Sequence, residues 1–230
     1  MDKKRLNPMQ DTLIKEKNFN VFHFTTTKSC GNMKDFATRK DFCKRNSIDH
    51  KKIVFANQVH GTMVKRVSSA DCETFIKDCD GLITDNKDIY LCIFTADCMP
   101  VFFVSRDYSA IAMVHAGWRG LAAGILENAI LSFKNIFGIS PQDVFAYIGP
   151  HINKCCYQIS DDLKKVFNLS PKENYLSLSN EASNQLKKLG LKRVYINSNC
   201  TCHQTDTFFS YRRQPTQDRI MSLISLKSSN

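Results

Sequence analysis

The chain has 230 residues, of which 43% are hydrophobic, and this is enough material for one sizeable core. It contains no run of about 18 apolar residues, so we expect no membrane association. The net charge is +10, from 32 Lys and Arg against 22 Asp and Glu. The basic residues are scattered and are not interleaved with aromatic residues, which argues against a nucleic-acid-binding protein. The positive charge is interpreted mainly as a solvated, lysine-rich surface, and an active site that attracts an anionic substrate is the alternative.

The N-terminal segment is polar and lacks the apolar core of a secretory signal, so export is not expected. We therefore predict a cytoplasmic protein whose ten cysteines are reduced thiols. No repeat or linker divides the sequence. Residues 1–230 are predicted to form a single domain, with 1–19 as a flexible or peripheral N-terminal segment.

Strands are predicted to dominate the first half of the chain. The expected elements, in chain order, are a strand at 20–27, a helix at 34–46, strands at 51–61 and 62–67, and a short strand after a turn within 80–85. Segment 89–105 is largely apolar but is interrupted by Asp97 and Pro100. It predicts two buried strands, or one strand bent at the proline, because proline cannot donate a hydrogen bond within a central ladder.

Helices are more frequent in the second half. The expected elements are a strand at 109–117, a helix at 120–138 that stops at Gly138, a strand at 144–150, helices at 159–169 and 180–190, and strands at 192–198 and 218–226. Neighbouring strands early and helices later predict an α+β fold with antiparallel or mixed sheets, rather than a regular α/β alternation.

Three apolar strands each deliver a reactive side chain to a turn, namely His60, Cys98 and His115. Two imidazoles and a thiolate suit Zn²⁺, and three protein ligands leave a fourth position open, as in catalytic zinc sites. Two other interpretations remain open at this point. The three residues could be ordinary buried side chains, or Cys98 and His115 could form a metal-free pair in which the thiolate attacks a carbonyl group.

Charged residues surround these candidates in the sequence. Asp97 lies in an apolar run and needs a partner, which a ligand histidine would supply. Arg119 opens the predicted helix after His115, and Arg212 and Arg213 are adjacent; all three are candidates for binding phosphate. Asp80 and Asp85 are interpreted as residues that cap turns.

A second metal site is not expected at the remaining cysteines. Cys155 and Cys156 are adjacent, so both thiols cannot easily point at one ion. The Cys200–His203 cluster lacks a partner at the spacing of a zinc finger.

Several motifs together resemble the YfiH family, also called the laccase-domain or multicopper polyphenol oxidoreductase family and now labelled purine nucleoside phosphorylase. In order, from about residue 20 to 226, they are NQVHG, DGLITD, FTADCMPVFF, VHAGWRGLAAGILE, IGPHINKCCYQIS and CTCHQTDTFFSYRR, followed by DRIMSLISL. The chain departs from the family pattern in loops, among them 25–31, where an expected arginine is absent and Lys28 is its candidate replacement.

The resemblance implies two packed mixed β-sheets with outer helices, a layered α/β/β/α arrangement like that of the cytotoxic-necrotizing-factor catalytic domain. It places the zinc ligands, which are also the expected catalytic residues, at His60, Cys98 and His115. The implied activities are phosphorolysis of adenosine, inosine and methylthioadenosine, and deamination of adenosine. The expected partners are a purine nucleoside and phosphate, and the expected assembly is a monomer or homodimer.

Copper-dependent phenol oxidation is the older implication of the resemblance. Copper could replace zinc at such ligands, but the sequence offers no ligands for several copper ions. We therefore rank this activity below nucleoside chemistry, together with the metal-free Cys–His hydrolase or amidase.

Overall fold

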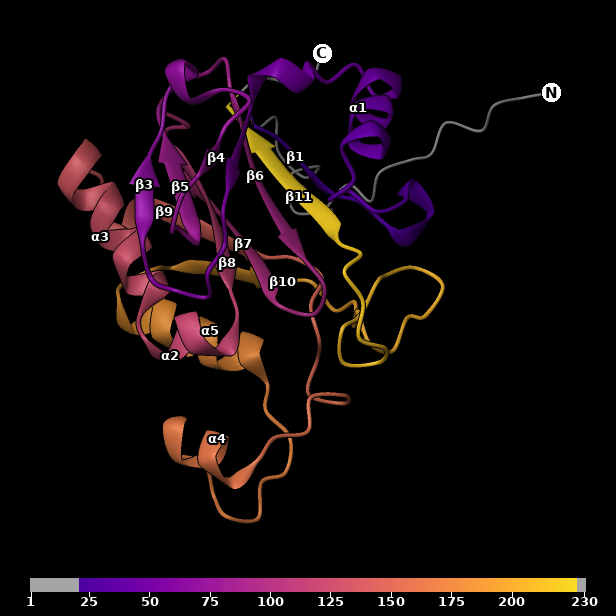
Figure 1. Ribbon diagram of the computed structural model, residues 1–230. Helices are drawn as coiled ribbons and strands as arrows, with labels where there is room; N and C mark the ends of the chain where they lie inside the picture. Colours follow the sequence, from indigo (N-terminus) through magenta and orange to yellow (C-terminus); the bar gives the residue numbers. More distant parts are fainter. Residues whose placement is uncertain (1–20, 227–230) are drawn as a thin grey trace.

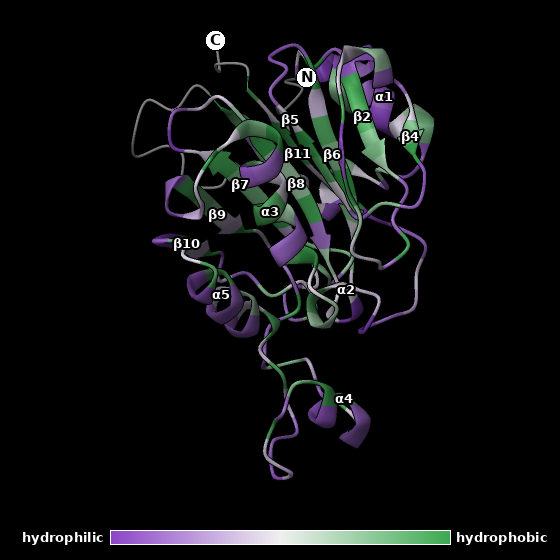
Figure 2. Cartoon of the chain, turned by 90° about the vertical axis from the view of Figure 1, so that its left-hand side faces the viewer, coloured by the Kyte–Doolittle hydropathy of each residue, from purple (hydrophilic) through white to green (hydrophobic). Residues whose placement is uncertain are grey.

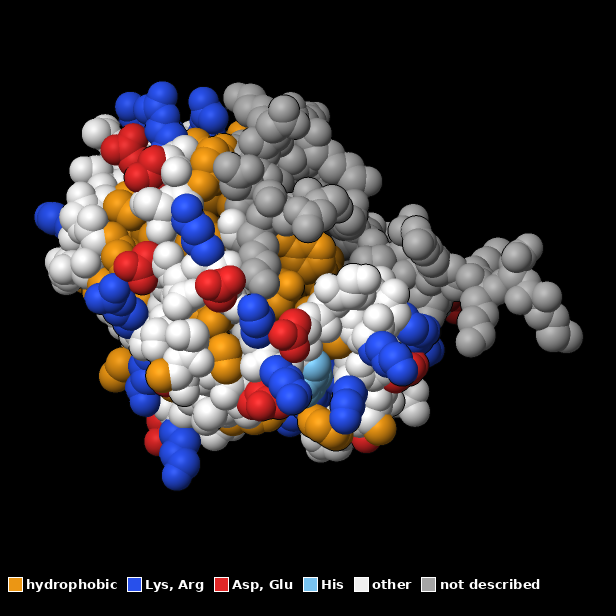
Figure 3. All heavy atoms as spheres, turned by 90° about the horizontal axis from the view of Figure 1, so that it is seen from above, with side chains coloured by type: hydrophobic (Ala, Val, Ile, Leu, Met, Phe, Trp, Pro, Cys, Tyr) orange, Lys and Arg blue, Asp and Glu red, His pale blue; other side chains and the backbone are white. Residues whose placement is uncertain are grey.

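A computed structural model describes residues 21–226 of the chain (Figure 1). The expectation for residues 1–19 lies outside the described residues. Within them, no helix has the length and apolarity that crossing a bilayer requires. Lys and Arg side chains are dispersed among Asp and Glu on the face shown in Figure 3.

The first sheet has five strands in the described part of the chain, in the order β1-β11-β6-β2-β4. These strands are β1 (Phe22–Thr25), β2 (Ile53–Ala56), β4 (Phe75–Ile76), β6 (Tyr90–Thr95) and β11 (Ile220–Ser225). β11 pairs antiparallel with β1 and β6, whereas β2 pairs parallel with β6 and β4. The sheet is therefore mixed, and it joins the two ends of the described chain.

The second sheet has six strands among the described residues, in the order β10-β9-β7-β8-β5-β3. They are β3 (Val64–Arg66), β5 (Gly81–Thr84), β7 (Met99–Ser105), β8 (Ile111–Ala116), β9 (Val144–Ile148) and β10 (Arg193–Ile196). The central pairs are antiparallel, and the edge pairs β10–β9 and β3–β5 are parallel.

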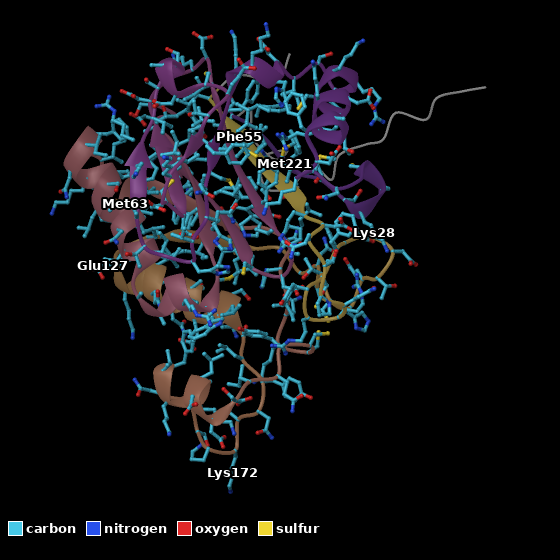
Figure 4. All side chains as sticks on the ribbon, viewed as in Figure 1. Lys28, Phe55, Met63, Glu127, Lys172 and Met221 are labelled. Carbon is cyan, nitrogen blue, oxygen red and sulfur yellow. The ribbon has the colours of Figure 1, made fainter. Side chains whose placement is uncertain are left out.

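The two sheets pack face to face, and helices cover their outer faces (Figures 1 and 2). Leu91 and Ile93 of the first sheet share one buried cluster with Phe102 and Met113 of the second. α1 (Phe36–Arg45) closes a second cluster on the first sheet, which includes the buried Phe55 and Met221, labelled in Figure 4. α3 (Ile125–Phe137) and α5 (Leu178–Lys188) cover the second sheet. The predicted α+β arrangement of two mixed sheets with outer helices is confirmed.

Gly124 divides the helix that the sequence predicts at 120–138. The segment forms α2 (Trp118–Ala122) and α3, because Gly124 has a φ of 94° and breaks the helical path between them. α3 ends at Gly138, as predicted, in a left-handed cap. The predicted helix at 159–169 is short, α4 (Asp161–Val166), and projects away from the body of the molecule (Figure 1).

The segment at 89–105 forms two strands that belong to different sheets. β6 ends at Thr95 in the first sheet, and β7 begins at Met99 in the second. Pro100 lies near the start of the central strand β7, opposite His115, and its carbonyl accepts a hydrogen bond from Gly149. The turn at 96–98 therefore carries the chain from one sheet to the other and sets Cys98 at the edge where the sheets meet.

Candidate metal centre

The structure brings His60, Cys98 and His115 together from three separate segments. Each offers one ligand atom, and the three atoms lie within 4.8 Å of one another. His60 follows β2 in a turn, Cys98 lies between β6 and β7, and His115 is near the end of β8. The two imidazole rings meet edge to face, with centroids 4.8 Å apart. Exposure decreases from His60, through Cys98, to the buried His115, so the group is anchored in the core and open at one side.

Asp80 holds two of these three residues in place. One of its carboxylate oxygens is 2.7 Å from His115 Nδ1. The same carboxylate accepts hydrogen bonds from the backbone N–H groups of Val59, His60 and Gly61. His60 has a φ of 60°, a left-handed conformation that is unfavourable for histidine, and these hydrogen bonds hold it there. Asp80 thus fixes both the turn that carries His60 and the orientation of the His115 ring.

The electrostatics of the site follow from this buried network. Burial of Asp80 would raise its pKa, but hydrogen bonds from His115 and Gly61 outweigh burial and hold the pKa below the usual value. Burial opposes protonation of His115, but the charge of Cys98 and the bond to Asp80 prevail and raise the pKa of His115 to about 9. Burial and the neighbouring His115 lower the pKa of His60. A metal ion bound here would add positive charge beside His115 and would therefore displace the proton from its ring.

The donor set fits a metal ion that accepts nitrogen and sulfur ligands. Asp80 engages His115 Nδ1, so Nε2 is the nitrogen that would coordinate, an arrangement common for ligand histidines. Gly117 leaves room beside the ligands: a Cβ atom at this position would lie 2.9 Å from His60 Nδ1 and 3.1 Å from Cys98 Sγ. Three ligands and this space are the features of a site with an open coordination position.

Asp97 does not bond a ligand histidine, contrary to the prediction. Its carboxylate accepts hydrogen bonds from the Thr201 hydroxyl and the Arg212 backbone N–H, both at 2.7 Å. The histidine partner is Asp80, which the sequence argument interpreted as a turn cap. Asp97 has a φ of 91°, and its side chain is bonded to residues 201 and 212. It joins the C-terminal segment to the turn that carries Cys98.

The three candidate ligands line one cavity of about 540 Å³, a size typical of small-molecule sites. Its other walls combine aromatic and cationic side chains. The aromatic ones are Phe75, Phe94, Trp118, Tyr157 and Tyr211, and the cationic ones are Lys34, Arg119, Arg212 and Arg219. The cavity can therefore hold a molecule with a flat apolar part and an anionic part.

Comparison with known proteins identifies the family. The family model described as "Multi-copper polyphenol oxidoreductase laccase" matches residues 32–227. The chain belongs to this family. "Purine nucleoside phosphorylase YfiH" of Shigella flexneri is 30% identical over 76% of the chain and 74% of its own length. "Purine nucleoside phosphorylase CA_C1699" of Clostridium acetobutylicum is 28% identical over 91% of the chain and 87% of its own length. These names indicate that the protein is an enzyme.

The fold of the laccase-domain family is also found in solved structures. The crystal structure of YlmD from Geobacillus stearothermophilus superposes with a TM-score of 0.83 at 26% identity, covering 90% of this chain and 92% of that one. The Bacillus licheniformis hypothetical protein YfiH gives the same TM-score at 28% identity, covering 90% and 93%.

The arginines predicted from the sequence have different environments in this laccase-domain protein. The Arg119 guanidinium lies 4.3 Å from the centroid of the Trp118 ring, at the cavity wall. Arg212 also lines the cavity, stacks on Tyr157 at 4.9 Å and donates to the Gln158 carbonyl. Arg213 is absent from the wall, because its guanidinium donates to the carbonyl oxygens of 201, 202 and 208.

Sequence reasoning missed Arg219 and Lys34 as cavity residues. Arg219 precedes β11 and donates to the carbonyls of Thr216 and Asp218. No motif of the sequence marks Arg219 or Lys34 as a binding residue, and only the fold brings them to the cavity. Lys28, the candidate replacement for an arginine, does not line the cavity and contacts the Thr205 carbonyl at 3.5 Å.

Proposed function

We propose that the protein is a zinc-dependent purine nucleoside phosphorylase that acts on adenosine, inosine and methylthioadenosine and also deaminates adenosine to inosine. The observation that carries the proposal is the group of two histidines and a cysteine opening into a cavity with aromatic and cationic walls. The phosphorylase names of the relatives support the same activity. The ten free thiols are compatible with a reducing, cytoplasmic setting.

Aromatic side chains on one side of the cavity suit a purine base. Phe75 and Phe94 lie nearly parallel, with ring centroids 6.4 Å apart and an interplanar angle of 20°. Phe55 stacks on both rings from the core. Because flat rings gain from offset stacking, this aromatic cluster gives a rigid platform against which the base can lie.

The cationic residues suit phosphate. Arg119 and Arg212 are held by stacking on Trp118 and Tyr157, and their side chains present delocalised charge to the cavity. In phosphorolysis, a phosphate oxygen forms a bond to the anomeric carbon of the ribose. The bond from that carbon to the purine nitrogen breaks, and the purine leaves with the electron pair and takes up a proton. The arginines would position the phosphate and offset its charge during this exchange.

His60, Cys98 and His115 would hold the zinc ion, which when bound would polarise a substrate oxygen or activate a water molecule for deamination. Asp80 keeps the His115 ring oriented for that role. These residues thus supply positioning and charge.

The test is a product assay on purified protein with adenosine, with and without phosphate, together with elemental analysis. We expect stoichiometric zinc, adenine and ribose 1-phosphate when phosphate is present, and inosine in either case. His60→Ala should lower both activities by at least roughly 100-fold, because removing a ligand costs more than removing its supporting partner. Cys72→Ser changes a thiol outside the cavity and should leave both activities intact.

Other outcomes would assign the site differently. Activity that survives both His60→Ala and metal removal would contradict the proposal. If neither nucleoside product forms while an electrophile reacts selectively with Cys98, the metal-free Cys98–His115 hydrolase is supported, which the Cys98–His115 contact favours. Stoichiometric copper with oxidation of phenols would support the laccase alternative.

A further inference from the structure

A second cluster of three cysteines lies outside the candidate metal centre. The thiols of Cys155, Cys156 and Cys200 lie within 4.8 Å of one another. Cys155 Sγ is 3.5 Å from Cys156 Sγ and 3.8 Å from Cys200 Sγ. Adjacency in sequence was expected to prevent Cys155 and Cys156 from pointing at one ion. The structure differs because a turn at 153–157, closed by a hydrogen bond from the Tyr157 N–H to the Asn153 carbonyl, directs both thiols to the same side.

Cys200 lies in the core beside a backbone hydrogen-bond donor. It is 5% exposed, and its Sγ accepts a hydrogen bond from the Asn153 backbone N–H at 3.3 Å. Burial would raise the pKa of Cys200, but backbone N–H groups of Asn153, His203 and Cys202 prevail and lower it. Burial, the main cause, and Cys200 raise the pKa of Cys155 against the opposing effect of the Cys156 thiol. Burial and the thiols of Cys155, Cys200 and Cys202 raise the pKa of Cys156. The fold therefore gathers three thiols at one point, which is the arrangement that a thiophilic cation needs.

We propose that Cys155, Cys156 and Cys200 form a second metal site that binds one Zn²⁺ ion. Sulfur atoms around tetrahedral zinc, at about 2.3 Å from the ion, are separated by roughly 3.8 Å, which is close to the two Sγ distances in the cluster. Cys202 follows two residues after Cys200 and is near enough for its charge to act on Cys156, so it is the nearest candidate for a fourth ligand.

The surroundings of the cluster suit a metal complex with excess negative charge. Three thiolates around Zn²⁺ carry a net negative charge. Arg212 donates to the Cys156 carbonyl at 3.4 Å, and Arg213 donates to the Cys202 carbonyl at 2.9 Å. Both guanidinium groups therefore lie beside the cysteine segments. This placement accounts for Arg213, which the cavity does not use.

The cluster joins two segments that form one wall of the cavity. Segment 151–157 contributes Ile152 and Tyr157 to the cavity, and the Ile152 N–H donates to the Asp97 carbonyl. Thr201, next to Cys200, donates to the Asp97 carboxylate. An ion held by both segments would cross-link them behind the cavity, so its role would be to stabilise this wall.

A disulfide is a less suitable product of the same thiols. Adjacent Cα atoms are about 3.8 Å apart, whereas disulfide-linked cysteines usually have Cα atoms at 4.4 Å or more. A Cys155–Cys156 bond would therefore be strained. A Cys155–Cys200 bond would leave Cys156 unpaired, whereas a metal ion uses all three sulfurs.

The test is titration of the reduced, metal-free full chain with Co²⁺, which reports thiolate ligands through charge-transfer absorption. We expect wild type to bind about two equivalents, one at each site. Cys155→Ser, a change at an exposed thiol, should lose one equivalent and most of the charge-transfer absorption. Cys98→Ser should lose the other equivalent and keep most of that absorption. Cys72→Ser is the matched control and should keep both.

A thermal measurement makes the assignment independent of the proposed function. In the Cys98→Ser background, Zn²⁺ should raise the melting temperature, and adding Cys155→Ser should abolish this rise. The proposal is overturned if Cys155→Ser binds as much Co²⁺ as wild type. It is equally overturned if the metal-free chain takes up Co²⁺ only at Cys98, or if mass spectrometry finds a disulfide at these cysteines in protein purified without reductant. Loss of nucleoside activity alone affects neither result.

Discussion

At the scale of single residues, the candidate centre depends on a carboxylate that is not itself a ligand. Asp80 accepts one hydrogen bond from His115 and three from the 59–61 backbone. Its side chain is fully buried, and its bond to His115 is buried, whereas the three bonds to the 59–61 backbone are part-buried. Charged hydrogen bonds of this kind are stronger than neutral ones, and Asp80 therefore sets both the orientation of one histidine and the backbone conformation of the other.

We expect Asp80→Asn to weaken zinc affinity by about 10–100-fold. The amide keeps the size of the side chain but loses the charge that orients the Nδ1–H of His115. Competitive titration against a chromophoric chelator measures the effect. Asp85→Asn is the control, because Asp85 is an exposed partner of Arg66 and should leave affinity unchanged. Equal affinities for wild type and Asp80→Asn would show that the carboxylate does not organise the centre.

At the scale of secondary-structure elements, three strand ends and one helix start create the centre. Strands β2, β6 and β8 end close to His60, Cys98 and His115. Gly117 is the N-cap of α2 and lies against the ligands, so the helix begins directly behind the space for the metal ion. The φ of Gly117 is −75°, which any residue can adopt, so the backbone conformation does not require glycine. The lack of space beside the ligands does require it.

Gly117→Ala should reduce zinc occupancy strongly while the fold is retained. The added methyl group would lie 2.9 Å from His60 Nδ1 and 3.1 Å from Cys98 Sγ, closer than carbon atoms normally approach such groups. Gly138→Ala is the opposite control: its methyl group meets nothing within 4 Å, but the φ of 70° should cost about 1 kcal/mol of stability. Zinc content and urea unfolding of both variants separate the two effects. Full zinc occupancy in Gly117→Ala would refute this account.

At the scale of the whole molecule, packing two sheets and their helices removes from water polar groups other than the candidate ligands. His151 is completely buried, its Nδ1 is 2.8 Å from the Gly149 carbonyl, and its Nε2 has no hydrogen-bond partner among the described atoms. Burial lowers the pKa of His151 from 6.5 to about 4, against the opposing effect of the Gly149 bond. The native fold therefore excludes a proton that the unfolded chain binds.

This exclusion predicts loss of stability in acid. Above pH 6.5 both states hold a neutral His151, and the fold keeps its full stability. Between pH 6.5 and 4 the unfolded chain binds the proton, so the free energy of unfolding falls by roughly 3 kcal/mol in total. Urea unfolding of wild type and His151→Gln from about pH 7 to 5 tests this. The variant should show a shallower dependence on pH, and identical slopes would contradict the prediction.

The sequence determined the parts of this protein that depend on local pattern or residue type. Apolar and β-branched runs predicted most strands, and the glycine at 138 predicted a helix end, because conformational preferences act over a few residues. His60, Cys98 and His115 could be singled out because their side chains are the types that bind metals and each ends an apolar run. The family motifs then gave the layered α+β arrangement.

Only the tertiary structure decided which distant groups meet. Asp80 rather than Asp97 bonds His115, because β5 pairs with β8 and sets Asp80 beside that histidine, while the chain crosses between sheets at Asp97. Cys200 joins Cys155 and Cys156 through a bridge between His151 and Cys200. Strand register and the crossing of the chain between sheets fix such contacts. Both depend on the packing of the whole chain, so residues that are neighbours in the sequence do not specify them.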